Sequence, residues 1–251
     1  MENKLSEFLN SKVLLYNHPN FIADDPVCIP HKFKKQQDIE IAGFFAALLA
    51  WGNRKSIINS CNHLMNLMDN APYDFIMNKN ENGKDYIPLM KFVHRTFNTT
   101  DLNGFLLGLK HCYQNGGLEA AFANSSPFLE MRISSFREKF IPFLNPRTLK
   151  HVANPSTGSA SKRLIMFLRW MCRPAKNGVD FGLWTAISPA QLMIPLDVHT
   201  GNISRKLGIL KRTQNDWKAN EELQAFCQKL DPKDPAKYDF ALFGLGIYEN
   251  F

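Results

Sequence analysis

Apolar residues recur at spacings of three and four along most of this chain, and no other feature constrains its fold as strongly. One such face is formed by Ile39, Ala42, Phe45, Ala46 and Leu49. A repeat near 3.6 residues is typical of amphipathic α-helices. Alternating β-branched runs joined by an Asn-Gly turn, which would indicate a hairpin of strands, are absent from the sequence. The chain is therefore predicted to be all-α.

The same spacing gives approximate helix positions. Asp101 is a candidate N-cap for a helix that closes near Gly116. Further helices are predicted over residues 2–17, 38–52, 57–68, 127–141, 159–173, 197–207, 216–230 and 236–248. The polar stretch from Asn78 to Asp85 is predicted to be a surface loop, and the sequence contains no Walker or GxGxxG phosphate loop.

Composition narrows the class of protein. The chain has 251 residues, of which 45% are apolar and 21% charged, as in ordinary globular proteins. Its longest strongly apolar run, from Ile41 to Trp51, has 11 residues, whereas a membrane span needs about 20. The first ten residues lack the apolar core of a signal peptide. We expect a cytoplasmic protein that binds no membrane.

Cysteine and histidine spacing argues against a resident metal. Five cysteines stand 33 or more residues apart, so no Cys-x-x-Cys pair is available for a zinc ribbon or an iron–sulfur cluster. The seven histidines form neither an HExxH nor a His-x-x-x-His pattern. We expect no metal and no cofactor.

Positive charge is concentrated in one segment. The net charge is +7, and residues 160–212 hold nine basic side chains against two acidic ones, Asp180 and Asp197. The rest of the chain is balanced. A localised positive field attracts polyanions such as nucleic acid. A solvated basic face with no partner would have the same composition, so both interpretations stay open.

A cluster of small residues precedes the apolar run that begins at Leu164. Gly158 permits a positive φ, and the free N–H groups of the helix that follows would form a phosphate site blind to base sequence. A plain helix start would look the same. Lys162 lies in the first turn, where the helix dipole and Arg163 favour the neutral amine and so lower its pKa. A neutral amine can attack a sugar C1′ and form a Schiff base, although a solvent-facing lysine is the simpler interpretation.

Asp197 precedes another predicted helix. A carboxylate there would accept backbone N–H groups as an N-cap. It would also be held ionised, in a fixed direction, so that it could stabilise positive charge on a ribose ring or shuttle protons for an amine. His199, on the same first turn, is a candidate phosphate contact.

Taken together, these two segments resemble the helix-hairpin-helix DNA glycosylase superfamily, which includes endonuclease III and the 8-oxoguanine glycosylases. The Gly158-Ser-Ala-Ser-Lys162 stretch resembles the Gly-x-Gly-x-Lys hairpin with its catalytic lysine, and Leu196-Asp197-Val-His199 resembles the Val-Asp-x-His segment with its catalytic aspartate. The stretch from Asp239 to Gly246 resembles the late helix that closes the fold. The whole chain is similar to a bacterial family related to this superfamily, close in style to the archaeal 8-oxoguanine DNA glycosylases.

The resemblance implies two helical lobes with the active site in the cleft between them. Residues 41–190 would form a barrel that includes the helix-hairpin-helix at about 150–173, and residues 1–40 with 195–251 the second lobe. Lys162 and Asp197 would face each other across this cleft. Their separation of 35 positions, with Trp184 and Pro189 in between, implies an inserted helix.

The implied activity is removal of a damaged base, such as an oxidised purine, from double-stranded DNA, with AP-lyase strand scission through a Lys162 Schiff base. Asn53 or Arg54 would fill the vacated stack. The remaining implied DNA contacts are Gly158, Ser159, Ser161, Arg163, His199 and Arg205. Met166, Trp51, Phe240 and Phe243 are candidates for the base pocket, although each would also suit a core. The resemblance implies a monomer near the nucleoid.

Two departures from the superfamily pattern leave alternatives open. Ala160 stands where the pattern has its second glycine, and Ser159 where it has an apolar residue, so a binding protein without catalysis remains an alternative. A glycosylase that uses water instead of lysine is another. The hairpin could also hold a monovalent ion.

Overall fold

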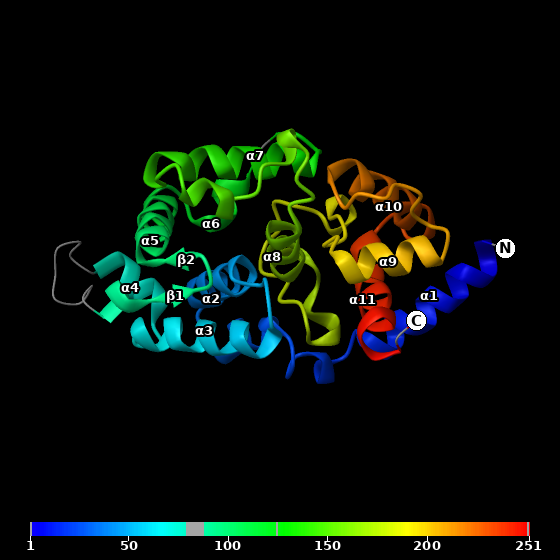
Figure 1. The fold of residues 1–251 in the computed structure, drawn as a ribbon, viewed down its shortest axis with the longest axis horizontal. Coiled ribbons are helices and arrows are strands. Elements are labelled where there is room, and N and C mark those ends of the chain that lie inside the picture. Colours follow the sequence, from blue (N-terminus) through cyan, green and yellow to red (C-terminus); the bar gives the residue numbers. More distant parts are fainter. Residues whose placement is uncertain (1, 79–87, 124, 250) are drawn as a thin grey trace. The chain divides into compact units, whose positions relative to one another are not determined.

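The computed structural model describes residues 2–78, 88–123, 125–249 and 251, and these are mostly helical, which confirms the all-α prediction (Figure 1). The helices are α1 (Glu2–Tyr16), α2 (Gln36–Leu48), α3 (Arg54–Leu67), α4 (Pro72–Asn78), α5 (Thr99–Gln114), α6 (Leu118–Phe122), α7 (Leu129–Phe140), α8 (Lys162–Cys172), α9 (Val198–Lys206), α10 (Trp217–Leu230) and α11 (Tyr238–Tyr248). Short 3₁₀ turns join several of them. Most of the loop expected from Asn78 to Asp85 lies outside the described residues.

The chain divides into two compact units. Unit 1 consists of Met1–Ala23, Ser126–Glu130 and Asn154–Phe251, and unit 2 of Asp24–Ser125 and Met131–Ala153. Residues 154–190, which we expected in the barrel lobe of 41–190, belong in this division with the C-terminal helices. Arg169 of α8 pairs with Asp239 of α11, and Arg173, directly after α8, pairs with Asp234.

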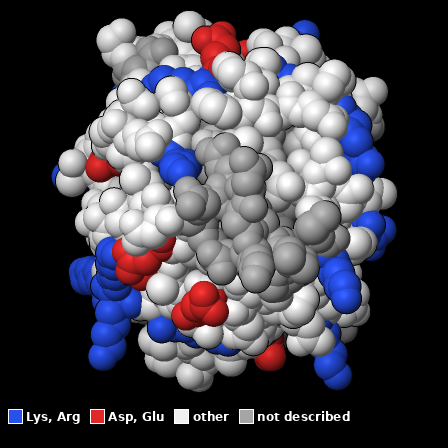
Figure 2. All heavy atoms as spheres, turned by 90° about the vertical axis from the view of Figure 1, so that its left-hand side faces the viewer, with Lys and Arg blue, Asp and Glu red and all other residues white. Residues whose placement is uncertain are grey.

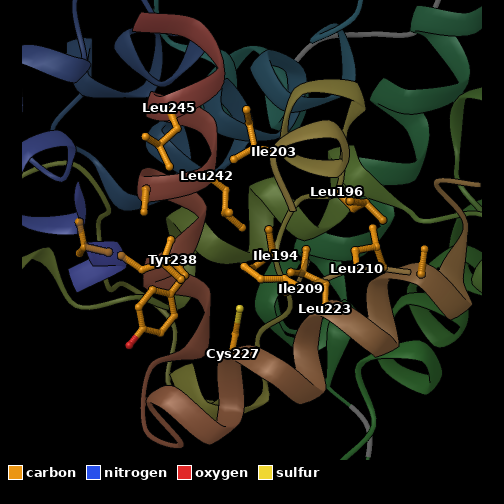
Figure 3. Packing of buried hydrophobic residues seen from close by; sticks show 14 of the residues in the cluster. Ile194, Leu196, Ile203, Ile209, Leu210, Leu223, Cys227, Tyr238, Leu242 and Leu245 are labelled. Atoms are coloured by element: carbon orange, nitrogen blue, oxygen red, sulfur yellow. The ribbon is translucent and has the colours of Figure 1, made fainter. Parts of the chain in front are cut away.

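Unit 1 is organised around α11, whose residues Tyr238 to Leu245 are largely buried (Figure 3). Helices α1 and α9 pack against it. Gly244 allows α1 to come close, because a Cβ there would lie 2.2 Å from the ring of Tyr16. The core cluster also contains Leu223 and Cys227 from α10.

In unit 2, α2 is enclosed by α3, α4 and the 3₁₀ turns at 26–28 and 30–32. Every residue from Asp38 to Leu48 is buried. The rings of Phe44, Phe105 and Phe140 lie about 5.9 Å from one another, centre to centre. Their packing gives this unit an aromatic core of its own.

Several local predictions need correction. The N-cap of α5 is Asn98, and Asp101 is the other member of its capping box. The sequence reasoning missed α4, α6 and the antiparallel strands β1 (Val93–His94) and β2 (Phe97–Asn98), all too short to show a period. In residues 173–197, all of them described, there are 3₁₀ turns at 175–177 and 189–191 but no inserted α-helix. Trp184 packs edge-on against Phe167 instead.

Within the described residues, none of the helices combines the length and the apolar character that crossing a bilayer requires.

Candidate functional site

Lys162 and Asp197 meet in unit 1. Lys162 is the first residue of α8, Asp197 is the N-cap of α9, and Lys162 Nζ lies 3.2 Å from Asp197 Oδ2. The other carboxylate oxygen, Oδ1, accepts the N–H of Thr200 at 2.9 Å. The two side chains are 32% and 14% exposed, so solvent reaches the amine while the carboxylate is held. Both belong to unit 1, whereas we expected them to face each other across a cleft between two lobes.

The hairpin before α8 fixes where Lys162 begins its helix. Gly158 has φ +91° and Ser161 has φ +50°, whereas Ala160 is buried in the core cluster. The left-handed positions of the hairpin are thus 158 and 161, so an alanine at 160 is unstrained. The Gly158 carbonyl accepts the N–H of Trp217 at 2.9 Å, which ties the hairpin to the start of α10. Ser161 Oγ donates to the Ser159 carbonyl at 3.3 Å.

A second set of hydrogen bonds holds the backbone of Asp197. The Asp197 carbonyl accepts Asn215 Nδ2 at 3.0 Å, and Asn215 Oδ1 accepts the Arg205 guanidinium at 2.7 Å. Arg205 Nε also donates to the Arg212 carbonyl at 2.7 Å. Gly201 leaves room for this arrangement, because a Cβ there would lie 2.5 Å from Asn215 Oδ1. Arg205, which we predicted to contact DNA, therefore holds Asn215 and the Arg212 carbonyl, and through Asn215 it supports the backbone of Asp197.

A third charged group, missed by the sequence reasoning, lies near the pair. Asp239 is 6% exposed and accepts a hydrogen bond from Arg169. Burial raises the pKa of Asp239 to about 6; Arg169 and Lys162 oppose this rise, and Asp197 and Asp180 add to it. The Asp239 carboxyl is thus within electrostatic reach of both members of the pair. In the sequence, the sign of this group is that Asp239 is a single acidic residue at the start of an otherwise apolar helix.

Two arginines of the basic segment are interior. Arg169 Nε lies 3.3 Å from Asp180 Oδ1, and Arg173 pairs with Asp180 and Asp234. Both guanidinium groups also lie over the ring of Phe240, at 4.5 and 5.4 Å. Arg169 and Arg173 therefore contribute no exposed charge to the basic segment of residues 160–212. Burial also lowers the pKa of the half-buried Arg163.

An open groove runs along α9, next to Gly246 of α11 and to Phe251. It has a volume of about 300 Å³ and is lined by His199, Asn202, Ile203, Arg205, Lys206, Gly246 and Phe251. His199 is exposed, as a phosphate contact requires, and Lys206 Nζ donates to the Phe251 carbonyl at 2.7 Å. The lining of this groove is basic and partly apolar.

The candidates for the base pocket separate by burial. Phe240 is fully buried beneath the two arginines and meets Phe21 edge-on, so it is a core residue and cannot stack on a base. Phe243 is half-buried and also packs on Phe21. Met166 is half-buried on α8, so part of its side chain reaches solvent.

The other predicted site residues belong to unit 2. Asn53 is the N-cap of α3 and accepts the N–H of Ser56 at 3.2 Å, and Arg54 begins that helix. Trp51 is half-buried, with the Arg95 guanidinium 4.9 Å from its ring centre. On the face that carries α4 and α5, lysines and arginines stand mainly around the margin, with acidic side chains between some of them (Figure 2). The described atoms of this face thus show both signs of charge.

Metal chemistry has no obvious ligand set in the described residues, where no three His, Cys, Asp or Glu side chains come together to hold an ion.

The family described as "Protein of unknown function (DUF2400)" matches residues 25–248. No curated protein and no solved structure matches the chain.

Proposed function

Since the chain belongs to the DUF2400 family, whose description assigns no activity, we propose from its own residues that it is a DNA glycosylase with AP-lyase activity. One observation carries the proposal: a lysine amine and a fixed carboxylate, 35 residues apart in sequence, lie 3.2 Å from each other at a solvent-accessible helix start. A binding protein needs no such pair, whereas Schiff-base chemistry needs both groups.

The pair suits the successive steps of that reaction. Its resting ion pair stabilises the ammonium form, so Lys162 must first give a proton to Asp197 or to solvent. The neutral Nζ then attacks C1′ as the bond between C1′ and the base breaks, Nζ gives up a proton, and the base leaves with a proton. The C1′–O4′ bond then breaks, O4′ takes a proton, and the nitrogen lone pair forms the protonated Schiff base. Loss of the C2′ proton from this Schiff base expels the 3′ phosphate by β-elimination. Asp197 stabilises the sugar cation while Thr200 holds its Oδ1.

We extend the proposal to the fold and to DNA binding. Unit 1 would contain the helix-hairpin-helix element of a two-lobed glycosylase fold. The hairpin at Gly158, the first turn of α8 and the groove of His199 and Lys206 would contact phosphates. Extrusion of the damaged base would cost a few kcal/mol of lost stacking and pairing, as in other enzymes of this kind.

Borohydride trapping on a duplex with one abasic site tests the lyase activity. We expect a covalent adduct with the wild-type protein, its loss in Lys162→Gln, and a reduction of 10²-fold or more in Asp197→Asn, since general acid–base groups contribute about 10²–10⁴. Lys229→Gln, at the far end of α10, is the matched control and should trap normally. Circular dichroism would confirm that each variant is folded.

The other outcomes separate the alternatives. On a second duplex that carries a damaged base, base release without an adduct would indicate a glycosylase that uses water. Duplex binding without release or adduct would indicate a binding protein, and the catalytic proposal would then be abandoned.

A further inference from the structure

Helix α8 carries two ion pairs on the same side. Lys162 and Arg169 are seven residues apart, which is two turns, so their side chains leave the helix in nearly the same direction. Lys162 pairs with the N-cap of α9, and Arg169 pairs with Asp239 in the first turn of α11. Helices α9 and α11 also pack against each other. These three helices are thus joined by one exposed and one buried ion pair.

The buried pair continues into a chain of charges. Arg169 also faces Asp180, and Asp180 faces Arg173, which ends the chain on Asp234. Two guanidinium groups here meet three carboxylates, so the chain carries a surplus of one negative charge when all are ionised. Asp239, at one end, lies near Lys162 and Asp197, whereas Asp234, 26% exposed, lies at the other end.

We propose that Asp239 is a positioning residue for the Lys162–Asp197 pair: through Arg169 it fixes α8 against α11, and its negative charge stabilises the ammonium form of Lys162. This inference rests on the proposed function for its catalytic meaning, but the electrostatic coupling can be measured without DNA. The charged and titratable groups that face Asp239 are Lys162 and Arg169 on α8, Asp180 after it, Asp197 at α9 and Cys227 on α10.

Asp239→Asn removes the negative charge and leaves Arg169 without its α11 partner. The loss of this negative charge favours the neutral amine of Lys162, so we expect trapping to rise at a lower pH in Asp239→Asn than in the wild-type protein. Asp234→Asn is the matched control, because it breaks the far end of the same chain and should leave the pH profile in place.

A second measurement does not depend on activity. Lys162 is accessible enough for reductive methylation with ¹³C-formaldehyde, and its resonance can be assigned by its absence in Lys162→Gln. The midpoint of its NMR titration should move to lower pH in Asp239→Asn and stay in Asp234→Asn. In the wild-type protein the same resonance should show an inflection near pH 6, where Asp239 ionises. That inflection should persist in His199→Gln, which excludes the neighbouring imidazole as its source.

These outcomes are distinguishable from failure of the proposed function. A shifted Lys162 titration without trapping in any variant would support the coupling and reject the lyase. If Asp239→Asn changes neither the pH profile of trapping nor the titration of Lys162, the inference is overturned even if the wild-type protein traps DNA. If Asp239→Asn does not fold, the wild-type inflection decides, and its absence would reject the coupling.

Discussion

Single residues of the hairpin show what the sequence motif does and does not require. The pattern has glycines at two positions, yet here the left-handed residues are Gly158 and Ser161, while Ala160 uses its methyl group in the core. A left-handed φ costs a non-glycine residue about 1–2 kcal/mol. Packing of Ala160 and the hydrogen bonds of Ser161 to Ser159 offset that cost. The motif therefore predicts the presence of a hairpin better than it predicts which of its residues adopt a left-handed φ.

Asp239 also makes stability depend on pH. Its folded-state pKa of about 6 is above the ordinary value of 3.8, so the folded protein takes up a proton before the unfolded chain does. The resulting stabilisation is fully present below pH 3.8 and is lost as the pH rises through 6. Relative to Asp239→Asn, the wild-type protein should gain up to about 3 kcal/mol between pH 8 and pH 4. Urea unfolding at each pH measures this difference, and a flat difference would contradict the shifted pKa.

Lys162 and Asp197 could be predicted from sequence because each is part of a short motif with its own local geometry. Asp239 could not, since its role comes from a contact with Arg169, 70 residues away in the chain. Arg169 and Arg173 looked like surface charges for the same reason: their neutralising partners, Asp234 and Asp239, lie in a distant segment.

Helix bounds were predicted well where the apolar repeat continues over a long stretch of sequence. They were predicted poorly where that stretch is short. Predicted and observed bounds of α1, α9, α10 and α11 agree within two residues. By contrast, α6 has five residues, too few for a period to emerge. The distances between helices depend on small residues, and the sequence does not reveal which glycine serves that purpose.

Gly244 and Gly246 on α11 provide a matched test of this point. A Cβ at 244 would lie 2.2–2.5 Å from the ring of Tyr16, which stacks on Tyr248, so α1 would have to move. A Cβ at 246 would lie 3.2 Å from His199 Cβ and needs only a small adjustment. Both substitutions to alanine gain about 1 kcal/mol of helix propensity.

We therefore expect Gly244→Ala to lower the free energy of unfolding by about 1–3 kcal/mol, as overpacked cores do, and Gly246→Ala to be close to neutral. Thermal unfolding compares the two variants directly. Equal melting temperatures would show that the close approach of α1 to α11 at Gly244 does not limit the stability of the protein.

For the molecule as a whole, the count of nine basic side chains in residues 160–212 overstates the number of cations available to a nucleic acid. Arg169 and Arg173 are neutralised internally, and Arg212 pairs with Asp216. The exposed cations of residues 160–212 include Lys176, Lys206 and Lys211. Affinity for a duplex should depend on these lysines, not on the composition of the segment.

The salt dependence of DNA binding measures that contribution. Each phosphate contact adds about 0.9 to the slope of log Kd against log salt, because binding releases condensed counterions. Lys206→Gln, in the groove with His199, should reduce the slope by about 0.9, and the double variant with Lys211→Gln by about twice as much. Lys229→Gln, exposed at the C-terminal end of α10, should leave it unchanged. Fluorescence anisotropy on an undamaged duplex gives the slopes, and a reduction in Lys229→Gln equal to that in Lys206→Gln would mean that binding follows net charge instead of this surface.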